Sequence, residues 1–434
     1  MSNPLEQSLT NAALIWDCDE SPLWRVAELV IRPLHLALAY PSILYVAAIS
    51  VFLFRPPDLF SFYADRLAFG VLVFSVALRT MALRDKLPFF PGLTLPMLAL
   101  TTLAVLRALR EPFDAQLWSI VASKFIVPFV LFHIAALVFR GPSERRHFEI
   151  FVALALAYLV FIAIAFLCDA RSLIYPRFIL DESMGFHPDR ARGPFLQAVA
   201  NGVSLNLLGV LVLVLPQKGK KFVWLLWLAL PVAILATMTR AVWISFALSS
   251  LVLGFRLIRR RLLTAVILAV VAGLVAGIAL GVSKHSLQDA LSDRTSERGP
   301  VEARMAVYNA GWAMFEERPL TGWPAGRMYA ELGRRMEGYH LRIFYVHNTY
   351  LAFLVEFGWP GLALYVVLVF NLFHLARKNV RGEPAAVAAL RRAWPIFLFV
   401  YLINACFVDM TYQFVIGLLF TVAGMLCARE EVFA

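Results

Sequence analysis

The sequence predicts an all-α, polytopic integral membrane protein with about twelve transmembrane helices and one large helical loop outside the membrane. Hydrophobic residues make up 61% of the 434 residues and charged residues only 16%, with a mean hydropathy of +0.73. Soluble proteins carry roughly 25% charged residues, so a water-soluble fold is excluded. The apolar residues also gather into runs of about twenty, the length that crosses a bilayer. The longest polar interruption between these runs is residues 283–346.

The expected transmembrane helices are the apolar runs themselves. Charged residues, glycine and proline bound them, and the tenth run contains a predicted break at Gly358-Trp359-Pro360-Gly361. The runs are residues 37–54, 66–83, 89–107, 116–139, 149–168, 196–215, 222–238, 241–257, 262–282, 350–376, 394–409 and 412–428.

Positively charged connections give these helices a direction, because cytoplasmic loops are enriched in Lys and Arg. With the polar segment Met1 to Pro22 in the cytoplasm, the loop 169–194, the turn at Thr239-Arg240 and the loop 283–346 are expected on the outer side. The net charge of +11 is then explained without a nucleic-acid partner. The cytoplasmic connections contain Arg84, Lys86, Arg140, Arg145, Arg146, Lys218, Lys220, Lys221, Arg256, Arg259, Arg260, Arg261, Arg377, Lys378, Arg381, Arg391 and Arg392.

This pattern divides the chain into three parts. Residues 1–189 hold about five spans and the first outer loop, residues 190–376 form a core that includes loop 283–346, and residues 377–434 hold the last spans. The long loop is itself expected to fold. Apolar residues recur at three-to-four spacing in Val301–Glu317, which predicts an amphipathic helix, and Gly326–Met336 is expected as a second short helix. The loop is therefore predicted to cap the outer surface of the membrane.

Arginines accumulate on the predicted outer side, against the charge rule. A guanidinium presents five donors in a planar fork that matches phosphate oxygens, so these residues predict a phosphate-recognition surface. Arg192 and Arg240 are the leading candidates, and Arg304 on the expected loop helix is a supporting one. The position of Arg240 also fits an arginine that extends from a helix end to the membrane surface. That of Arg304 also fits an ion pair inside the cap.

His347, at the mouth of the tenth span, is the candidate general base. Its ordinary pKa near 6.5 suits proton abstraction at neutral pH, although the position also fits a histidine that only begins a helix. Asn348 is expected either to cap that helix or to orient a ligand. Gln197 and Asn201 share one face of a span, where polar side chains line a cavity or contact a neighbouring helix. Asp409 is either an ordinary exposed residue or a second base.

Several kinds of site have no signature in the sequence. The four cysteines are scattered and predict neither a disulfide framework nor a metal site. There is no glycine-rich phosphate loop followed by lysine, no HExxH pattern and no Asp-x-Asp pair in an outer loop. Few acidic residues fall in the middle of the spans, which argues against ion-coupled transport. We therefore expect neither a metal nor a cofactor.

Several short motifs, taken together, resemble the O-antigen ligase and O-antigen polymerase superfamily. The similarity covers roughly residues 190–376, and the first five spans share only hydropathy with that family. The motifs are Arg192-Gly193 followed by Asn201, the Thr239-Arg240 turn, a loop helix with Arg304 that leads to Arg318-Pro319-Leu320-Thr321-Gly322, then His347-Asn348-Thr349-Tyr350 and Glu356-Phe357-Gly358-Trp359-Pro360-Gly361.

The resemblance implies a GT-C-type, inverting and metal-independent glycosyltransferase of the bacterial inner membrane, with its active site facing the periplasm. Its donor would be a glycan on undecaprenyl diphosphate. A ligase would transfer this glycan to a hydroxyl of lipid A-core, and a polymerase would join lipid-linked repeat units. A flippase or exporter of the same lipid-linked sugars is an alternative from another class.

The roles of that family carry over to named positions in this sequence. They make His347 the catalytic residue and Arg192 and Arg240 the residues that bind the diphosphate. Gln197, Asn201, Arg304 and Asn348 are expected to support them, with no metal and no cofactor.

Overall fold

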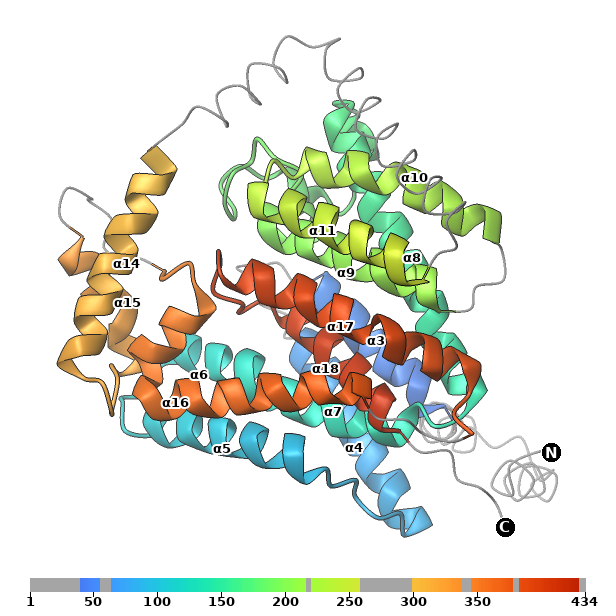
Figure 1. Ribbon diagram of the computed structural model, residues 1–434, viewed down its shortest axis with the longest axis horizontal. Helices are drawn as coiled ribbons and strands as arrows, with labels where there is room; N and C mark the ends of the chain where they lie inside the picture. Colours follow the sequence, from blue (N-terminus) through green and yellow to red (C-terminus); the bar gives the residue numbers. More distant parts are fainter. Residues whose placement is uncertain are drawn as a thin grey trace, which may run out of the picture.

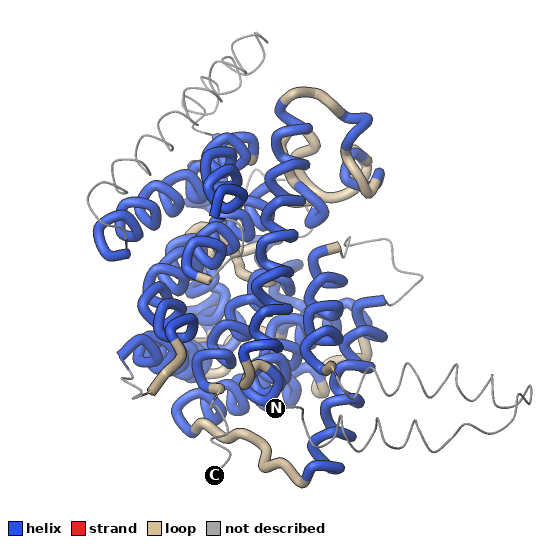
Figure 2. Tube along the Cα trace, turned by 90° about the vertical axis from the view of Figure 1, so that its right-hand side faces the viewer, coloured by secondary structure: helices blue, strands red, loops and turns tan. Residues whose placement is uncertain are grey.

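The computed structural model of the protein is helical in the part of the chain that it describes (Figure 2), and the predicted all-α class is confirmed there. That part comprises residues 40–54, 64–215, 220–257, 299–336, 345–377 and 382–428. Its α-helices are α3 (Pro41–Leu53), α4 (Ala64–Leu83), α5 (Pro91–Ala108), α6 (Ala115–Val121), α7 (Val127–Val138), α8 (Pro142–Leu167), α9 (Ala198–Val214), α10 (Lys220–Ala236), α11 (Arg240–Leu257), α14 (Gly299–Glu317), α15 (Ala325–Arg335), α16 (Thr349–His374), α17 (Ala385–Ala405) and α18 (Gln413–Cys427).

Six helical stretches among the described residues are long and apolar enough to cross a membrane, so the protein is a multi-pass membrane protein. They are α4, α5, the continuous stretch from α6 to α7, α8, α16 and α17. Helices α3, α9, α10 and α18 are apolar but have 10–17 residues each, and the stretch Arg240–Leu253 of α11 is likewise apolar and short. The predicted span 262–282 lies outside the described residues. The total of about twelve spans therefore stays a prediction.

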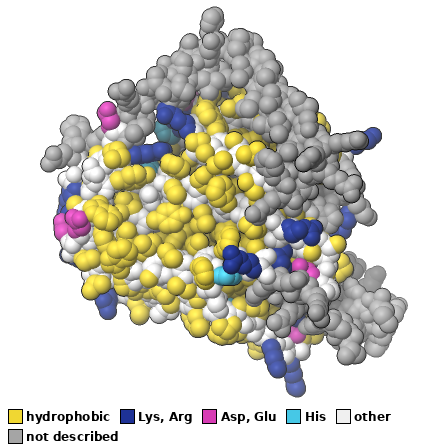
Figure 3. Space-filling view, in the orientation of Figure 1, with side chains coloured by type: hydrophobic (Ala, Val, Ile, Leu, Met, Phe, Trp, Pro, Cys, Tyr) yellow, Lys and Arg dark blue, Asp and Glu magenta, His cyan; other side chains and the backbone are white. Residues whose placement is uncertain are grey.

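The helices lie in two groups on either side of α17 (Figure 1). Helices α9 and α11 pack on one side of it, and α16 and α18 on the other. Helix α18 packs tightly on α7 at Gly424, where a Cβ atom would lie only 2.4 Å from the carbonyl oxygen of Phe132. Small residues allow such close helix packing in a membrane. Hydrophobic side chains dominate the surface in Figure 3, as expected for a protein surrounded by lipid tails.

Helix α16 is broken at the predicted place. Gly358 has φ 66° and ψ −164°, and a Cβ atom there would lie 2.4 Å from the carbonyl oxygen of Pro319. The first half of the helix, residues 349–357, folds back along the second, because the ring of Tyr365 stacks on Phe353 at 4.4 Å. A straight helix would separate these two residues by about 18 Å at 1.5 Å per residue. The start of α16 therefore lies beside the bundle instead of projecting from it.

The cap, defined here as residues 299–336, contains both of the predicted loop helices as α14 and α15. The indole ring of Trp323 lies between two guanidinium groups, 4.2 Å from that of Arg318 and 5.1 Å from that of Arg335. The backbone N–H of Trp323 donates to the carbonyl of Val355 at 2.7 Å. Gly322 has a positive φ of 62° and packs against the carbonyl of Glu356. The Arg-Pro-Leu-Thr-Gly motif thus joins the cap to the first half of α16.

Candidate functional site

The start of α16 and the loop 406–410, which follows α17, are joined by hydrogen bonds at the end of the bundle that carries the cap. The hydroxyl of Thr349 donates to the carbonyl of Val408 and accepts from the backbone N–H of Met410, both at 2.9 Å. Thr349 is buried, so water does not compete for these bonds. The loop therefore has a fixed position beside His347.

Helix α14 of the cap completes the site through Tyr308. Its hydroxyl lies 3.3 Å from the carbonyl oxygen of His347 and 3.4 Å from that of Cys406. Burial raises the pKa of Tyr308 above its ordinary value, although the nearby charge of Arg304 opposes the shift. The phenol is therefore neutral at physiological pH and serves as a hydrogen-bond donor between the three segments.

His347 is half-buried and has a positive φ of 52°. This backbone conformation is uncommon for a residue other than glycine, and strained residues of this kind concentrate at functional sites. Burial lowers the pKa of His347, and the positive charge of Arg304 lowers it further, while Asp409 acts in the opposite direction. The imidazole is therefore neutral near pH 7 and able to accept a proton.

Asn348 caps the first half of α16, which was one of the two roles predicted for it. Its side-chain oxygen accepts hydrogen bonds from the backbone N–H groups of Tyr350 at 2.9 Å and Leu351 at 3.1 Å. The positive end of the half-helix dipole therefore lies next to His347. Such helix starts attract anions and favour a neutral over a charged imidazole.

Arg304 and Arg240 are both exposed. Arg304 lies one turn before Tyr308 on α14 and forms no ion pair with another described residue, so the ion-pair interpretation finds no support there. Arg240 is the first residue of α11. The side chain of Asn404 donates to the hydroxyl of Ser245 at 2.9 Å, which fastens the beginning of α11 to the end of α17. The beginning of α11, with Arg240, and helix α14, with Arg304, are thus both joined to the end of α17, next to loop 406–410.

The comparison with protein families agrees with this arrangement. Residues 224–366 match the family described as O-antigen ligase. The matched segment is called the O-antigen ligase domain below, after the family to which it is similar. The predicted resemblance is thereby confirmed, and Arg240, Arg304 and His347 lie inside the matched segment. A search of the curated proteins finds no match.

Arg192 lies before the O-antigen ligase domain and has partners that the sequence did not suggest. The residue is 1% exposed. The Nε group donates to the carbonyl of Ile179 at 3.1 Å, and the two Nη groups donate to the carbonyls of Asp181 and Met184. The side chain is therefore the centre around which the loop 179–184 folds.

Gln197 and Asn201 belong to the same turn. Asn201 is fully buried and donates to the carbonyl of Ala191 at 2.8 Å. A Cβ atom on Gly193, whose φ is +56°, would lie 2.7 Å from the side-chain oxygen of Asn201. The backbone N–H of Ala191 donates to the carbonyl of Ala236 at 3.0 Å, which places this turn against the connection to Arg240. Gln197 is half-buried just before α9.

A buried group of charges lies behind loop 406–410 and was missed from the sequence. The ammonium of Lys124 lies 3.5 Å from Asp409 Oδ1 and 3.4 Å from Glu356 Oε2, and the three side chains are only 3–5% exposed. We call these three residues the Lys124 cluster. Only Glu356 lies within the O-antigen ligase domain. The burial of Asp409 excludes the interpretation that it is an ordinary exposed residue.

Two signals in the sequence could have revealed the Lys124 cluster. A lysine inside the run 116–139 and a glutamate inside the run 350–376 are costly in a membrane and mark functional sites. Glu356 is one of the few acidic residues inside the predicted spans. The π-helical turn η1 (Ala122–Ile126), which is centred on Lys124, could not have been read from the sequence. Such turns interrupt α-helices frequently at functional sites.

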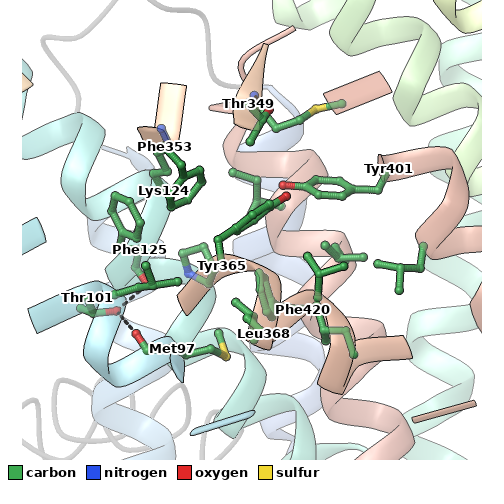
Figure 4. Close-up of a pocket in the computed structure, with 18 residues that line it drawn as sticks. Met97, Thr101, Lys124, Phe125, Thr349, Phe353, Tyr365, Leu368, Tyr401 and Phe420 are labelled. Carbon is green, nitrogen blue, oxygen red and sulfur yellow. Dashed lines mark hydrogen bonds between the residues drawn. The ribbon is translucent and has the colours of Figure 1, made fainter. Parts of the chain in front are cut away.

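A cavity of about 50 Å³ lies between α5, α7, α16, α17 and α18, and Thr349 is one of the residues that line it (Figure 4). Its walls are mostly apolar, and the hydroxyl groups of Tyr365 and Tyr401 point toward one another across it. The volume suits one or two water molecules at about 30 Å³ each. It is too small for a sugar, so we do not place the substrate of the O-antigen ligase domain there.

Proposed function

We propose that this protein is an inverting, metal-independent glycosyltransferase, an O-antigen ligase, that acts on the periplasmic face of the bacterial inner membrane. It transfers a glycan from undecaprenyl diphosphate to a hydroxyl of lipid A-core. The observation that carries the proposal is His347, whose lowered pKa and fixed position beside Arg304 and Asp409 suit a general base. The match of residues 224–366 to the O-antigen ligases supports the class of reaction.

In the proposed reaction, His347 accepts the proton of the acceptor hydroxyl while the oxygen attacks the anomeric carbon of the donor sugar. The bond between that carbon and the diphosphate oxygen breaks, and undecaprenyl diphosphate leaves with the electron pair. Attack opposite to the leaving group inverts the anomeric configuration. General-base catalysis of this kind contributes about 10²–10⁴-fold to the rate.

The leaving diphosphate gains negative charge as its bond to the sugar breaks. Arg240 and Arg304 are the proposed residues that bind it, because both are exposed guanidinium groups on helices that are joined to the end of α17, next to loop 406–410. The start of the half-helix at Thr349 adds partial positive charge. Arg192 is proposed to support diphosphate binding indirectly, because it orders the loop 179–193, which lies against the connection to Arg240. A donor already in place at a developing charge is worth about 2.7–4 kcal/mol.

The cap favours transfer over a flippase or exporter. Helix α14 contributes Tyr308, which hydrogen-bonds the backbone of His347, and Arg304, which acts on its imidazole. A folded cap that contacts the candidate base can take part in catalysis through these two residues. The charged residues inside the spans, which would otherwise suggest transport, are connected to this same site through Asp409.

The proposal is tested with the purified protein in detergent micelles or liposomes. The donor is a glycan on undecaprenyl diphosphate, and lipid A-core and a lipid-linked repeat unit are supplied as acceptors in parallel. A gel shift of lipid A-core is the expected product, and it should persist in the presence of a chelator. Products formed only from the repeat unit would assign a polymerase instead. Absence of both products from well-folded protein, or loss of product on chelation, would overturn the proposed reaction.

A further inference from the structure

The two carboxylates of the Lys124 cluster differ in the number of cations near them. Glu356 lies between two cations, because Arg107 of α5 also interacts with it electrostatically and stacks on the ring of the next residue, Phe357, at 5.4 Å. Asp409 has an ion pair with Lys124 only, among the residues that the structure describes. Lys124 is therefore the cation that stabilises the buried charge of Asp409, whereas Glu356 has Arg107 as a second cation.

Asp409 also uses only one of its carboxylate oxygens. Oδ1 accepts from Lys124, whereas Oδ2 is fully buried and has no hydrogen-bond partner in the described part of the chain. A buried, unbonded oxygen is costly and marks a place where another group is expected. The residue is held by loop 406–410, which Thr349 fastens next to His347.

The groups that face His347 come from two elements besides its own. Arg304 and Tyr308 approach from α14, and Asp409 approaches from loop 406–410. Cys406 and Tyr350 are the neighbouring titratable residues. Asp409 is the carboxylate whose charge acts on the imidazole. It opposes the effect of Arg304, and it is the group that could stabilise an imidazolium at this position.

We propose that Lys124 is a positioning residue for the transfer reaction: it pairs with the buried carboxylate of Asp409 in the loop beside His347, so that the imidazolium formed on proton abstraction is stabilised. This inference rests on the function proposed above. Lys124 lies too deep to touch substrate, since its side chain is 3% exposed. The π-helical turn η1 shapes the backbone at the point where Lys124 meets both carboxylates. A buried carboxylate without its cation would take up a proton instead, and His347 would lose that stabilisation.

The test compares Lys124→Met with Lys124→Arg and Glu356→Gln in the full-length protein. Lys124→Met should lower kcat about tenfold to a hundredfold, toward the lower end of what a general base contributes. It should also move the acidic limb of the profile of kcat/KM against pH to lower pH, because the pKa of His347 falls when Asp409 becomes neutral. Lys124→Arg should keep the limb of the unaltered protein. Glu356→Gln should keep it as well, because Asp409 retains its pair with Lys124.

Removal of a buried charge can reduce the amount of folded protein. Lys124→Gln is the second variant, since an amide can still donate a hydrogen bond to a carboxylate but carries no charge. It should show the same shift of the acidic limb as Lys124→Met. If folded Lys124→Gln or Lys124→Met protein keeps the acidic limb of the unaltered protein, or if Glu356→Gln moves the limb as far, the inference is wrong.

A measurement without activity separates this inference from the proposed function. His347 is titrated by NMR in histidine-labelled protein, and its signal is assigned by its absence from His347→Ala. Lys124→Met and Lys124→Gln should lower the pKa of His347, and Glu356→Gln should not. An unaltered protein that transfers no glycan would overturn the proposed function. An unchanged titration of His347 in an active protein would overturn the role of Lys124 alone.

Discussion

Two buried ion clusters, near opposite ends of α17, differ in how completely their groups are bonded. At its beginning, Arg391 donates to the carbonyls of Leu375 at 2.7 Å and Leu426 at 3.0 Å, and its Nε group donates to Glu383 at 3.0 Å. We call Arg391 and these partners the Arg391 cluster. Beyond its end, Lys124 meets Asp409 and Glu356 at 3.4–3.5 Å, and Asp409 Oδ2 has no hydrogen-bond partner among the residues that the structure describes.

The difference separates a structural role from a functional one. Every nitrogen of the Arg391 guanidinium forms a hydrogen bond, to the carbonyls of Leu375 and Leu426 or to Glu383, as expected of a fork that matches a carboxylate. The Lys124 cluster has longer contacts, and one oxygen of its Asp409 carboxylate has no hydrogen-bond partner in the described part of the chain. A site that must change its protonation state cannot have every group already saturated. Mutations at the two clusters should therefore change different properties.

The largest expected effect is that of His347→Ala. Transfer should fall by about 10²–10⁴-fold, the usual contribution of a general base, while the amount of protein in the membrane stays the same. The measurement is the rate of lipid A-core modification by purified protein, normalised to folded protein. His374→Ala, at the far end of α16, is the matched control. Undiminished transfer by His347→Ala would remove the base from the mechanism.

Arg391→Met should affect stability instead of catalysis. Removal of one partner from a buried ion pair costs about 3–5 kcal/mol, so the melting temperature of the protein in detergent should fall clearly. The specific activity of the molecules that stay folded, and their pH profile, should be unchanged. A shift of the pH profile in Arg391→Met would erase the distinction between the two clusters.

Arg240→Ala should reduce transfer by about 10²–10³-fold with little change in melting temperature, as expected for loss of a group that stabilises a leaving anion. Arg240→Lys should restore part of the rate, because an ammonium keeps the charge but loses the fork.

Arg192→Lys should instead lower the melting temperature before it lowers the rate of transfer. Its hydrogen bonds to backbone carbonyls involve a charged donor, each worth about 1.5–3 kcal/mol, so the loss should appear in melting temperature first. Equal behaviour of the two arginines would contradict this assignment.

The smallest effect expected is a shift in pH dependence on Arg304→Ala. Transfer should fall as the pH drops through the pKa of His347, because imidazolium cannot accept a proton. Since the pKa of His347 lies below its ordinary value of about 6.5, the unaltered protein should keep activity in mildly acidic buffer. Removal of the Arg304 charge should raise that pKa and move the acidic limb to higher pH. Arg334→Ala, on α15, is the control, and a shift to lower pH in Arg304→Ala would contradict the electrostatic argument.

Much of the fold follows from patterns that are local in the sequence. The apolar runs predicted the positions of the described helices, because about twenty apolar residues have few alternatives to a helix in lipid. Spacing of three and four residues predicted α14, and glycine and proline predicted the break in α16. The orientation in the membrane and the span at 262–282 stay predictions.

The site was predictable only in part. His347 and Asn348 could be found because they begin an apolar run, and the capping role of Asn348 is a local property. Arg192 could not be separated from Arg240 by sequence, since both are arginines next to turns on the same predicted side. The two arginines differ in their hydrogen-bond partners. The loop directs the backbone carbonyls of residues 179, 181 and 184 toward Arg192 and not toward Arg240.

The sequence by itself determined that this is a helical membrane protein with a segment similar to the O-antigen ligases, because helix formation, hydropathy and short motifs depend on neighbouring residues. Only the tertiary structure decided which charged residues share a site. Lys124, Glu356 and Asp409 are separated by more than two hundred residues of chain at their extremes, and no spacing rule connects them. Their meeting depends on α16 folding back at Gly358 and on α17 ending beside α14. The cost of burying charge in lipid then requires the three to pair.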